Sequence, residues 1–306
     1  MIVAFLDLLG FSQLVRHDIE TADDVMFEFN HIIKTKYIDN LTNPVDSYPE
    51  GMTEFVKSTS INTFQHMISV SDSLVLGASE EDADDFIKQL SKLVAAFAIR
   101  SLEPFRSRFS DVYHVKNTKH IKCKDIYGNS ICYNAFPILF RGGICAGNNV
   151  SFMVQSHIYN GQMTTSSTNV VGQTYINAYR LEGTDKGPRL FCDESLLNLV
   201  SDSVKSKIVE TSREGVSEIL WTYYACETDS CSPKKRSNVS ENMFDGLIIP
   251  TINLIKYYYS RGAEEVEHYI ALLKTIIKGV ELYASDNNVD IAYIENKIRS
   301  ELPDIY

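Results

Sequence analysis

The chain begins with an almost unbroken apolar run, Ile2–Leu8, in which the only charged residue is Asp7. A run of this length without polar alternation is typical of a strand covered on both faces. Two shorter apolar runs, His66–Val70 and residues 74–76, lie on either side of Ser71-Asp72-Ser73. Because serine and aspartate favour tight turns, this segment predicts a two-stranded hairpin with Asp72 at its tip.

Apolar residues recur at helical spacing between and after these strands. A helix is expected to begin at residues 21–24, where Thr21 starts a capping box, and another is expected to begin at residues 79–82. The pattern then predicts a strand over residues 137–146 and a further helix near residues 171–181. This order of elements predicts an α+β fold built on the ferredoxin-like βαββαβ unit.

Other parts of the chain do not belong to this unit. Residues 107–135 are polar and lysine-rich, which predicts a solvated hairpin or insertion; an arm that steers phosphate or contacts a second subunit is the alternative. Residues 39–60 and the basic run at 234–236 predict loops. From about Phe244 onward the pattern is helical and rich in aromatic residues, and we interpret it as a packing or oligomerisation element.

The negative net charge of the chain limits the classes of partner that we expect it to bind. At a formal net charge of −11, the 306 residues lack the dominant basic surface that nucleic-acid coating needs, although a small anion could still bind locally. No apolar run reaches the ~18–20 residues that span a bilayer, and no basic segment precedes the first apolar run as in a signal peptide. The six cysteines form no CxxC pair. We therefore expect a cytoplasmic protein with reduced thiols, no membrane insertion and no nucleic-acid partner.

Asp7 and Asp72 are the residues that indicate chemistry. Taken singly, Asp7 is explained as a strand-end residue that caps a turn, and Asp72 as an ordinary turn residue. In the predicted unit, however, the first strand and the hairpin are neighbours in one sheet, so the two carboxylates should lie side by side. Adjacent carboxylates repel each other unless cations lie between them, and Mg²⁺ or Mn²⁺ prefers such ligands together with substrate phosphates. Gly10 would let backbone N–H groups approach a phosphate closely.

Four segments, in the right order, resemble the motifs of class III adenylate/guanylate cyclases. VAFLDLLGFS at residues 3–12 resembles the first metal motif, SVSDS at 69–73 the second, RGGICAG at 141–147 the strand before the substrate loop, and GQTYINAYRLE at 172–182 the catalytic helix. The resemblance covers about residues 2–200. It implies a class III nucleotide-cyclase catalytic domain over residues 1–200, with an insertion at about 107–135. Residues 201–306 would then add the remaining strands and a helical C-terminal extension packed on the same domain.

The resemblance also implies functional roles for particular residues. These are Asp7, the backbone carbonyl of Leu8 and Asp72 for two Mg²⁺ or Mn²⁺ ions, Gly10 and Phe11 for the nucleotide, and Arg180 for the transition state. In this family the ribose 3′-hydroxyl attacks the α-phosphorus and pyrophosphate leaves. The sites form between subunits, which implies a head-to-tail homodimer with composite active sites. The alternative for Arg180 is an ordinary surface arginine on a helix.

Several positions differ from those of purine-selecting cyclases. The family has an asparagine four residues before the catalytic arginine; here Ile176 stands there, and Asn177 is turned by about 100° around the helix. The base-selecting positions align with Ile68, which cannot donate a hydrogen bond, and with Asn169, whose amide both donates and accepts. The motif sequences are most similar to the pyrimidine cyclases of bacterial Pycsar antiphage defence. That resemblance implies UTP or CTP as the substrate, and a cyclic UMP or cyclic CMP product that activates a separate membrane or TIR-domain effector.

Three hypotheses follow from the sequence. The first is a pyrimidine cyclase, which the motif sequences favour. The second is an adenylate or guanylate cyclase with rebuilt base selection, which Ile68 and Asn169 oppose. The third is a degenerate cyclase-like domain that binds nucleotide and regulates a partner without turnover; Ile176 favours it, whereas Asp7 and Asp72 oppose it. Other two-metal phosphotransferases remain a fourth, broader class.

Overall fold

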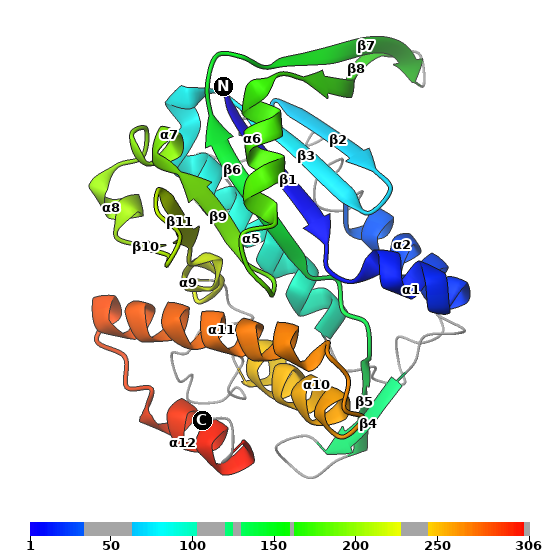
Figure 1. Cartoon of the computed structure of the whole chain (residues 1–306), viewed down its shortest axis with the longest axis vertical. Helices are drawn as coiled ribbons and strands as arrows, with labels where there is room; N and C mark the ends of the chain where they lie inside the picture. Colours follow the sequence, from blue (N-terminus) through cyan, green and yellow to red (C-terminus); the bar gives the residue numbers. More distant parts are fainter. Residues whose placement is uncertain (34–62, 103–119, 125–129, 160–161, 228–243, 303–306) are drawn as a thin grey trace.

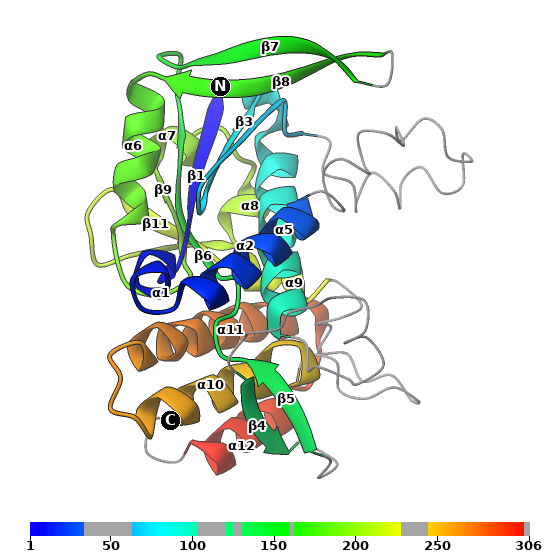
Figure 2. The same cartoon turned by 90° about the vertical axis from the view of Figure 1, so that its right-hand side faces the viewer.

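The fold consists of a central sheet with helices on both faces and a separate helical layer at one end (Figures 1 and 2). The computed structural model describes residues 1–33, 63–102, 120–124, 130–159, 162–227 and 244–302. The loops predicted at 39–60 and 234–236, and most of the polar segment 107–135, lie outside these ranges. Within that polar segment, β4 (His120–Lys124) and β5 (Ser130–Asn134) pair as the predicted hairpin.

The main sheet has seven strands among the described residues. The first strand pairs on one side with β3 and on the other with β6, both antiparallel, and β3 also pairs with β2. This arrangement is the βαββαβ unit expected from the sequence. The order across the sheet is β10 (Ile208–Glu210), β11 (Val216–Ile219), β9 (Leu190–Asp193), β6 (Phe140–Ala146), β1 (Ile2–Leu8), β3 (Ser73–Ala78) and β2 (His66–Val70).

Each face of the sheet is covered by its own helices, as the edge-on view in Figure 2 shows. Alternate residues of β1 point to opposite faces, so that Leu6 enters the larger core and Phe5 enters a smaller cluster. The larger core contains α2 (Ile19–Ile33) and α5 (Ala83–Leu102). On the opposite face lies α6 (Gln173–Glu182), together with one end of the hairpin formed by β7 (Ser151–Tyr159) and β8 (Gln162–Val171).

Two observed helix starts differ from the predicted ones. A short helix, α1 (Phe11–His17), precedes α2, and the sequence pattern did not predict it. Helix α2 then begins at Ile19 rather than at residues 21–24, because the Asp18 carboxylate accepts the N–H of Thr21 at 3.1 Å and takes the capping role. Thr21 itself is fully buried. The predicted capping box was therefore wrong by one turn.

Two strand predictions also need correction. The strand expected from residue 137 begins at Phe140, because the N–H of Ile138 is held by the Ser101 hydroxyl at 2.9 Å rather than by a neighbouring strand. An antiparallel hairpin, β7 (Ser151–Tyr159) and β8 (Gln162–Val171), precedes α6 and was not predicted. Figure 1 shows this hairpin crossing the end of the sheet near the N-terminus.

The helical layer lies at the opposite end from that hairpin (Figure 1). The helical prediction from about Phe244 is confirmed. Glu218 on β11, of which 1% is exposed, accepts two hydrogen bonds from Arg189 beside β9 and one from Thr275 of the helical layer, and the Thr275 bond ties this layer to the sheet. The remaining helices are the 3₁₀ turn η3 (Glu80–Asp82), α7 (Glu194–Leu197), α8 (Asp202–Lys205), α9 (Trp221–Ala225), the π-helix η4 (Phe244–Ile248), α10 (Ile249–Tyr259), α11 (Val266–Asn287) and α12 (Ala292–Glu301).

Candidate active site

Asp7 lies near the end of β1, on the face of the sheet that α6 covers. The register places Ser73 of β3 and Arg141 of β6 directly opposite Asp7, one on each side. The Ser73 hydroxyl donates to one carboxylate oxygen of Asp7 at 3.1 Å, and Arg141 Nη2 donates to the other at 3.2 Å. The Asp7 side chain remains 22% exposed, so it can still be reached by a ligand.

Asp72 lies beside this group, in the turn between β2 and β3. Ser71 adopts a left-handed conformation with φ of 54°, which makes the turn tight. The carbonyl of Asp72 accepts the N–H of Leu8 at 3.0 Å, so the turn is bonded to the end of β1. Asp7, Leu8 and Asp72, predicted from the sequence as one group, are therefore brought together by the structure.

The environment of Asp7 acts on its pKa in both directions. Burial raises the pKa of Asp7 above 3.8 and is the largest effect, and the negative charge of Asp72 raises it further. The hydrogen bonds from Arg141 and Ser73 and the positive charge of Arg141 lower it. The negative charge of Asp72 beside the partly buried carboxylate of Asp7 indicates an electrostatic environment that favours a bound cation.

Arg141 bridges Asp7 to a second carboxylate, Glu182, which is the last residue of α6. Its Nε forms an ion pair with Glu182 Oε1. Burial raises the pKa of Glu182, and the charge of Arg141 lowers it. Neither residue was predicted from the sequence to have a functional role. Both residues belong to segments that resemble the family's motifs, and Arg141 lies in a strand that was expected to neighbour Asp7. These positions were the signal in the sequence that could have pointed to a role for the two residues.

The two glycines after Arg141 have a packing explanation. A Cβ at Gly143 would overlap with the carbonyl oxygen of Ala178 and with Leu181, so α6 can lie this close to β6 only because Gly143 has no side chain. On the other face, a Cβ at Gly142 would overlap with Leu6 and the carbonyl of Phe5. The close approach of α6 brings its C-terminal residue, Glu182, to Arg141.

Arg180, the predicted catalytic residue, lies exposed on α6. Arg141, and not Arg180, is the guanidinium that contacts Asp7 within one chain. Ile176, at the position of the family's asparagine, is 40% exposed. Asn177 accepts a hydrogen bond from Gln173 at 2.8 Å. The structure thus does not bring Arg180 into the group formed by Asp7 and Asp72 in a single chain.

The predicted nucleotide-binding residues occupy different places. Gly10 is exposed and left-handed with φ of 77°, at the start of α1, and nothing lies within 4 Å of a Cβ built there. Ile68 is buried in the small cluster on the α6 face. Asn169 is exposed on β8, where its Oδ1 accepts the N–H of Val170 at 2.8 Å. Phe11 is 8% exposed: its ring packs against the larger core and lines a cavity between the first two helices.

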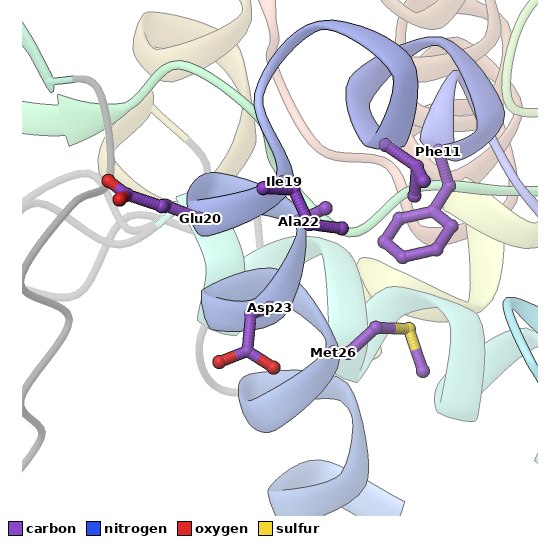
Figure 3. A pocket seen from close by; sticks show the side chains of 7 residues that line it. Phe11, Ile19, Glu20, Ala22, Asp23 and Met26 are labelled. Atoms are coloured by element: carbon purple, nitrogen blue, oxygen red, sulfur yellow. The ribbon is translucent and has the colours of Figure 1, made fainter.

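A cavity of about 390 Å³ lies between α1 and α2, with Phe11 on its wall. Figure 3 shows the ring of Phe11 and the thioether of Met26 at one side, with the Glu20 and Asp23 carboxylates away from them. Neither Asp7 nor Asp72 lines this cavity. It is therefore separate from the carboxylate group at the end of β1.

The residues at the end of β1 suit a small divalent cation. Among the described residues, no group of three or more His, Cys, Asp or Glu side chains is placed to hold a metal ion by itself. Mg²⁺ is commonly held by one or two carboxylates, with substrate phosphates and water completing its shell. Asp7 and Asp72 provide such a pair, so the donor set fits a metal that arrives with a nucleoside triphosphate. In the part of the chain that the structure covers, no helix combines the length and apolarity needed to cross a bilayer.

Comparisons with known proteins give low similarities. No family model matches the chain, and no curated protein matches it. The guanylyl cyclase domain of the RhoGC fusion protein from the aquatic fungus Blastocladiella emersonii aligns at a TM-score of 0.35 and 16% identity, over 72% of this chain and 94% of that one. The adenylyl cyclase CyaB from *P. aeruginosa* aligns at a TM-score of 0.38 and 12% identity, over 78% and 96%. Overlaps of this quality assign no activity to the chain; the α+β fold is established by its own topology.

Proposed function

We propose that the chain is a nucleotide cyclase that converts a nucleoside triphosphate into a 3′,5′-cyclic nucleotide and pyrophosphate. The observation that supports this proposal best is the meeting of Asp7 and Asp72 at the end of β1, where Leu8 is bonded to the turn that carries Asp72. These residues stand in two segments that resemble the metal motifs of class III cyclases. In the reaction, a bond forms between the ribose 3′-oxygen and the α-phosphorus, the bond to pyrophosphate breaks, and the 3′-hydroxyl proton is released.

The residues at and around the two carboxylates would have different roles in this reaction. Asp7 and Asp72, with the Leu8 carbonyl, would hold two Mg²⁺ or Mn²⁺ ions, which when bound acidify the 3′-hydroxyl and neutralise charge on the phosphates. Ser73 holds one oxygen of Asp7 by a hydrogen bond, so the carboxylate is already partly oriented when substrate arrives. Gly10 leaves the backbone at the start of α1 open to a phosphate oxygen.

The proposed enzyme works as a homodimer in which Arg180 completes the site of the second copy. Arg180 is exposed and does not contact Asp7 in its own chain, which leaves it available to a neighbouring subunit. Large apolar side chains around it are also exposed, as expected for a surface that a second copy covers. These side chains, on α6 and the β7–β8 hairpin, are Ile176, Tyr179, Val171, Met153 and Val154.

UTP or CTP is the proposed substrate, with cyclic UMP or cyclic CMP acting on a separate membrane or TIR-domain effector in antiphage defence. Ile68 is buried and apolar, so it offers no hydrogen bond to a purine. Asn169 is exposed, and its amide both donates and accepts. Among the alternatives, the regulator without turnover is favoured by Asn177. Its Oδ1 accepts a hydrogen bond from Gln173, and it does not stand at the helix position of the family's transition-state asparagine.

The test is to incubate the purified chain separately with ATP, GTP, CTP and UTP in Mn²⁺ and to separate the products. A cyclic pyrimidine nucleotide that disappears in Asp72→Ala, but persists in the matched control Asp23→Ala, supports the proposal. Cyclic AMP or cyclic GMP alone would assign a purine cyclase, and nucleotide binding without product would assign the regulator. Mixing Asp7→Ala with Arg180→Ala chains tests the dimer, because a composite arrangement restores up to one working site of two.

A further inference from the structure

One guanidinium, that of Arg141, serves two carboxylates that come from different elements. Nη2 contacts Asp7 on β1, and Nε pairs with Glu182 at the end of α6. Arg141 is about one-third exposed, whereas only 11% of the Glu182 side chain is exposed. A planar guanidinium with donors on two edges can hold both partners at once, which an ammonium group does less well.

We propose that Glu182 is the counter-anion that retains Arg141 when Asp7 binds a divalent cation. This inference rests on the proposed function, since it takes Asp7 as a metal ligand. Arg141 must weaken its contact with Asp7 Oδ2 for that oxygen to bind a cation, and the partly buried guanidinium then needs another anion. Glu182 already pairs with it and can take over the charge without movement of the backbone. Glu182 is thus a positioning residue, which acts on the metal ligand through Arg141.

The position of Glu182 is fixed from two sides. On the side of the sheet, Gly143 allows α6 to pack directly on β6. On the side of the helical layer, the turn that follows Glu182 contacts α11. A Cβ at Gly187 would overlap with Ala271, and Lys186 forms an ion pair with Glu267. The C-terminal helical layer therefore supports the end of α6 that carries Glu182, close to the end of β1 (Figure 1).

The charges around Arg141 allow it to give up Asp7 while it stays paired with Glu182. Asp7 and Glu182 provide two negative charges against the single positive charge of Arg141, and Asp72 adds a third negative charge nearby. On α11, burial and the positive charge of Arg141 lower the pKa of His268, so this imidazole adds no further cation at neutral pH. Binding of a divalent cation by Asp7 and Asp72 balances the excess, while Glu182 continues to neutralise Arg141.

The experiment measures binding of Mn²⁺ alone to the full chain at pH 8, with free Mn²⁺ counted by EPR. Glu182→Gln keeps the size of the side chain but loses its charge, so Arg141 pairs with Asp7 alone and Mn²⁺ should bind about three- to tenfold more weakly. Arg141→Gln removes the competitor of the cation, so Mn²⁺ should bind about three- to tenfold more tightly. The control Glu267→Gln also loses one negative charge, but it does not contact Arg141 and should leave the affinity unchanged.

The opposite signs of the two variants distinguish the proposal from a structural role. If Arg141 and Glu182 only brace the fold, both substitutions weaken Mn²⁺ binding, and the proposal is overturned. Should Glu182→Gln fail to fold, which thermal unfolding would show, the Arg141→Gln result decides alone: tighter binding supports the proposal and weaker binding overturns it. Asp7→Ala and Asp72→Ala, measured alongside, test the proposed function itself, which fails if both retain full Mn²⁺ affinity.

Discussion

The two faces of the central sheet differ in what covers them. On one face, Ile2, Ala4 and Leu6 of β1 enter a large continuous core with α2, α5 and the C-terminal helices. On the other face, Val3 and Phe5 enter a small cluster under α6, and Asp7 ends the row. Asp7, the proposed metal ligand on β1, lies on the second face. The even-numbered residues of this strand therefore enter the large core, whereas its odd-numbered residues pack under α6 and end in Asp7.

The difference also shows in the exposed side chains. Phe97, in the large core, is fully buried between Phe29 and Phe140. Tyr179, on the α6 face, is 55% exposed although its ring contacts Phe5 at 5.1 Å between centroids. The α6 face thus keeps exposed apolar side chains that a ligand or a second chain could cover, whereas the side chains of the large core are already enclosed.

The largest expected effect is a difference between the two faces in how much a truncated aromatic side chain lowers the free energy of unfolding. Phe97→Ala should lower the free energy of unfolding by about 3–5 kcal/mol, because it leaves a cavity in the closed core. Tyr179→Ala should lower it by less than about 1 kcal/mol, because most of the ring is already in water. Urea unfolding of the two variants and the parent chain measures both values. Equal losses would contradict the distinction between the two faces.

The next effect concerns how the helical layer is held to the sheet. Glu218→Gln should lower the free energy of unfolding by about 3 kcal/mol, because it leaves the partly buried guanidinium of Arg189 with only the exposed carboxylate of Asp185 as a counter-charge. The comparison is Glu267→Gln, which breaks the exposed ion pair with Lys186 and should leave unfolding unchanged within error. If Glu218→Gln is equally silent in urea unfolding, neither the ion pair with Arg189, which joins the start of β9 to β11, nor the hydrogen bond from Thr275 of the helical layer contributes measurably to stability.

The sequence predicted the parts of the fold that one continuous pattern defines. The apolar run of β1 and the hairpin around Asp72 were confirmed at the residues expected, and their neighbourhood follows from the βαββαβ order. Helix α1 was missed because it is only seven residues long and begins after a left-handed Gly10, so periodicity carries little signal there.

Features that depend on tertiary contacts were outside the reach of the sequence pattern. The segment of β8 is largely polar, and it becomes a strand by pairing with β7, whose Phe152 packs on His66 of β2. The pairing of Arg141 with Glu182 depends on the strand register and on the close approach of α6 at Gly143, neither of which spacing along the chain specifies. The roles of the site residues remain predictions.

The smallest expected effect is a pH dependence at the α6 face, where His66 joins the β7–β8 hairpin to the sheet. The His66 ring stacks on Phe152 with centroids 4.3 Å apart, and its Nδ1 lies 3.0 Å from the Ser167 hydroxyl. Burial lowers the pKa of His66 below 6.5. The unfolded chain therefore binds the proton more readily than the folded chain, and stability that is present above pH 6.5 is lost as the pH falls through the lower folded pKa.

His66→Phe is the variant that isolates this effect, because it keeps an aromatic ring against Phe152 but cannot titrate. Other groups also change protonation in this range, so the measurement is the difference between the parent and variant urea midpoints at pH 5 to 8. The parent midpoint should fall more steeply than that of His66→Phe below pH 6.5, since only the parent carries the imidazole of His66, which the fold keeps neutral. Parallel pH profiles would mean that His66 is protonated as readily in the folded chain as in the unfolded one. The α6 face would then be open to water even where the hairpin meets β2.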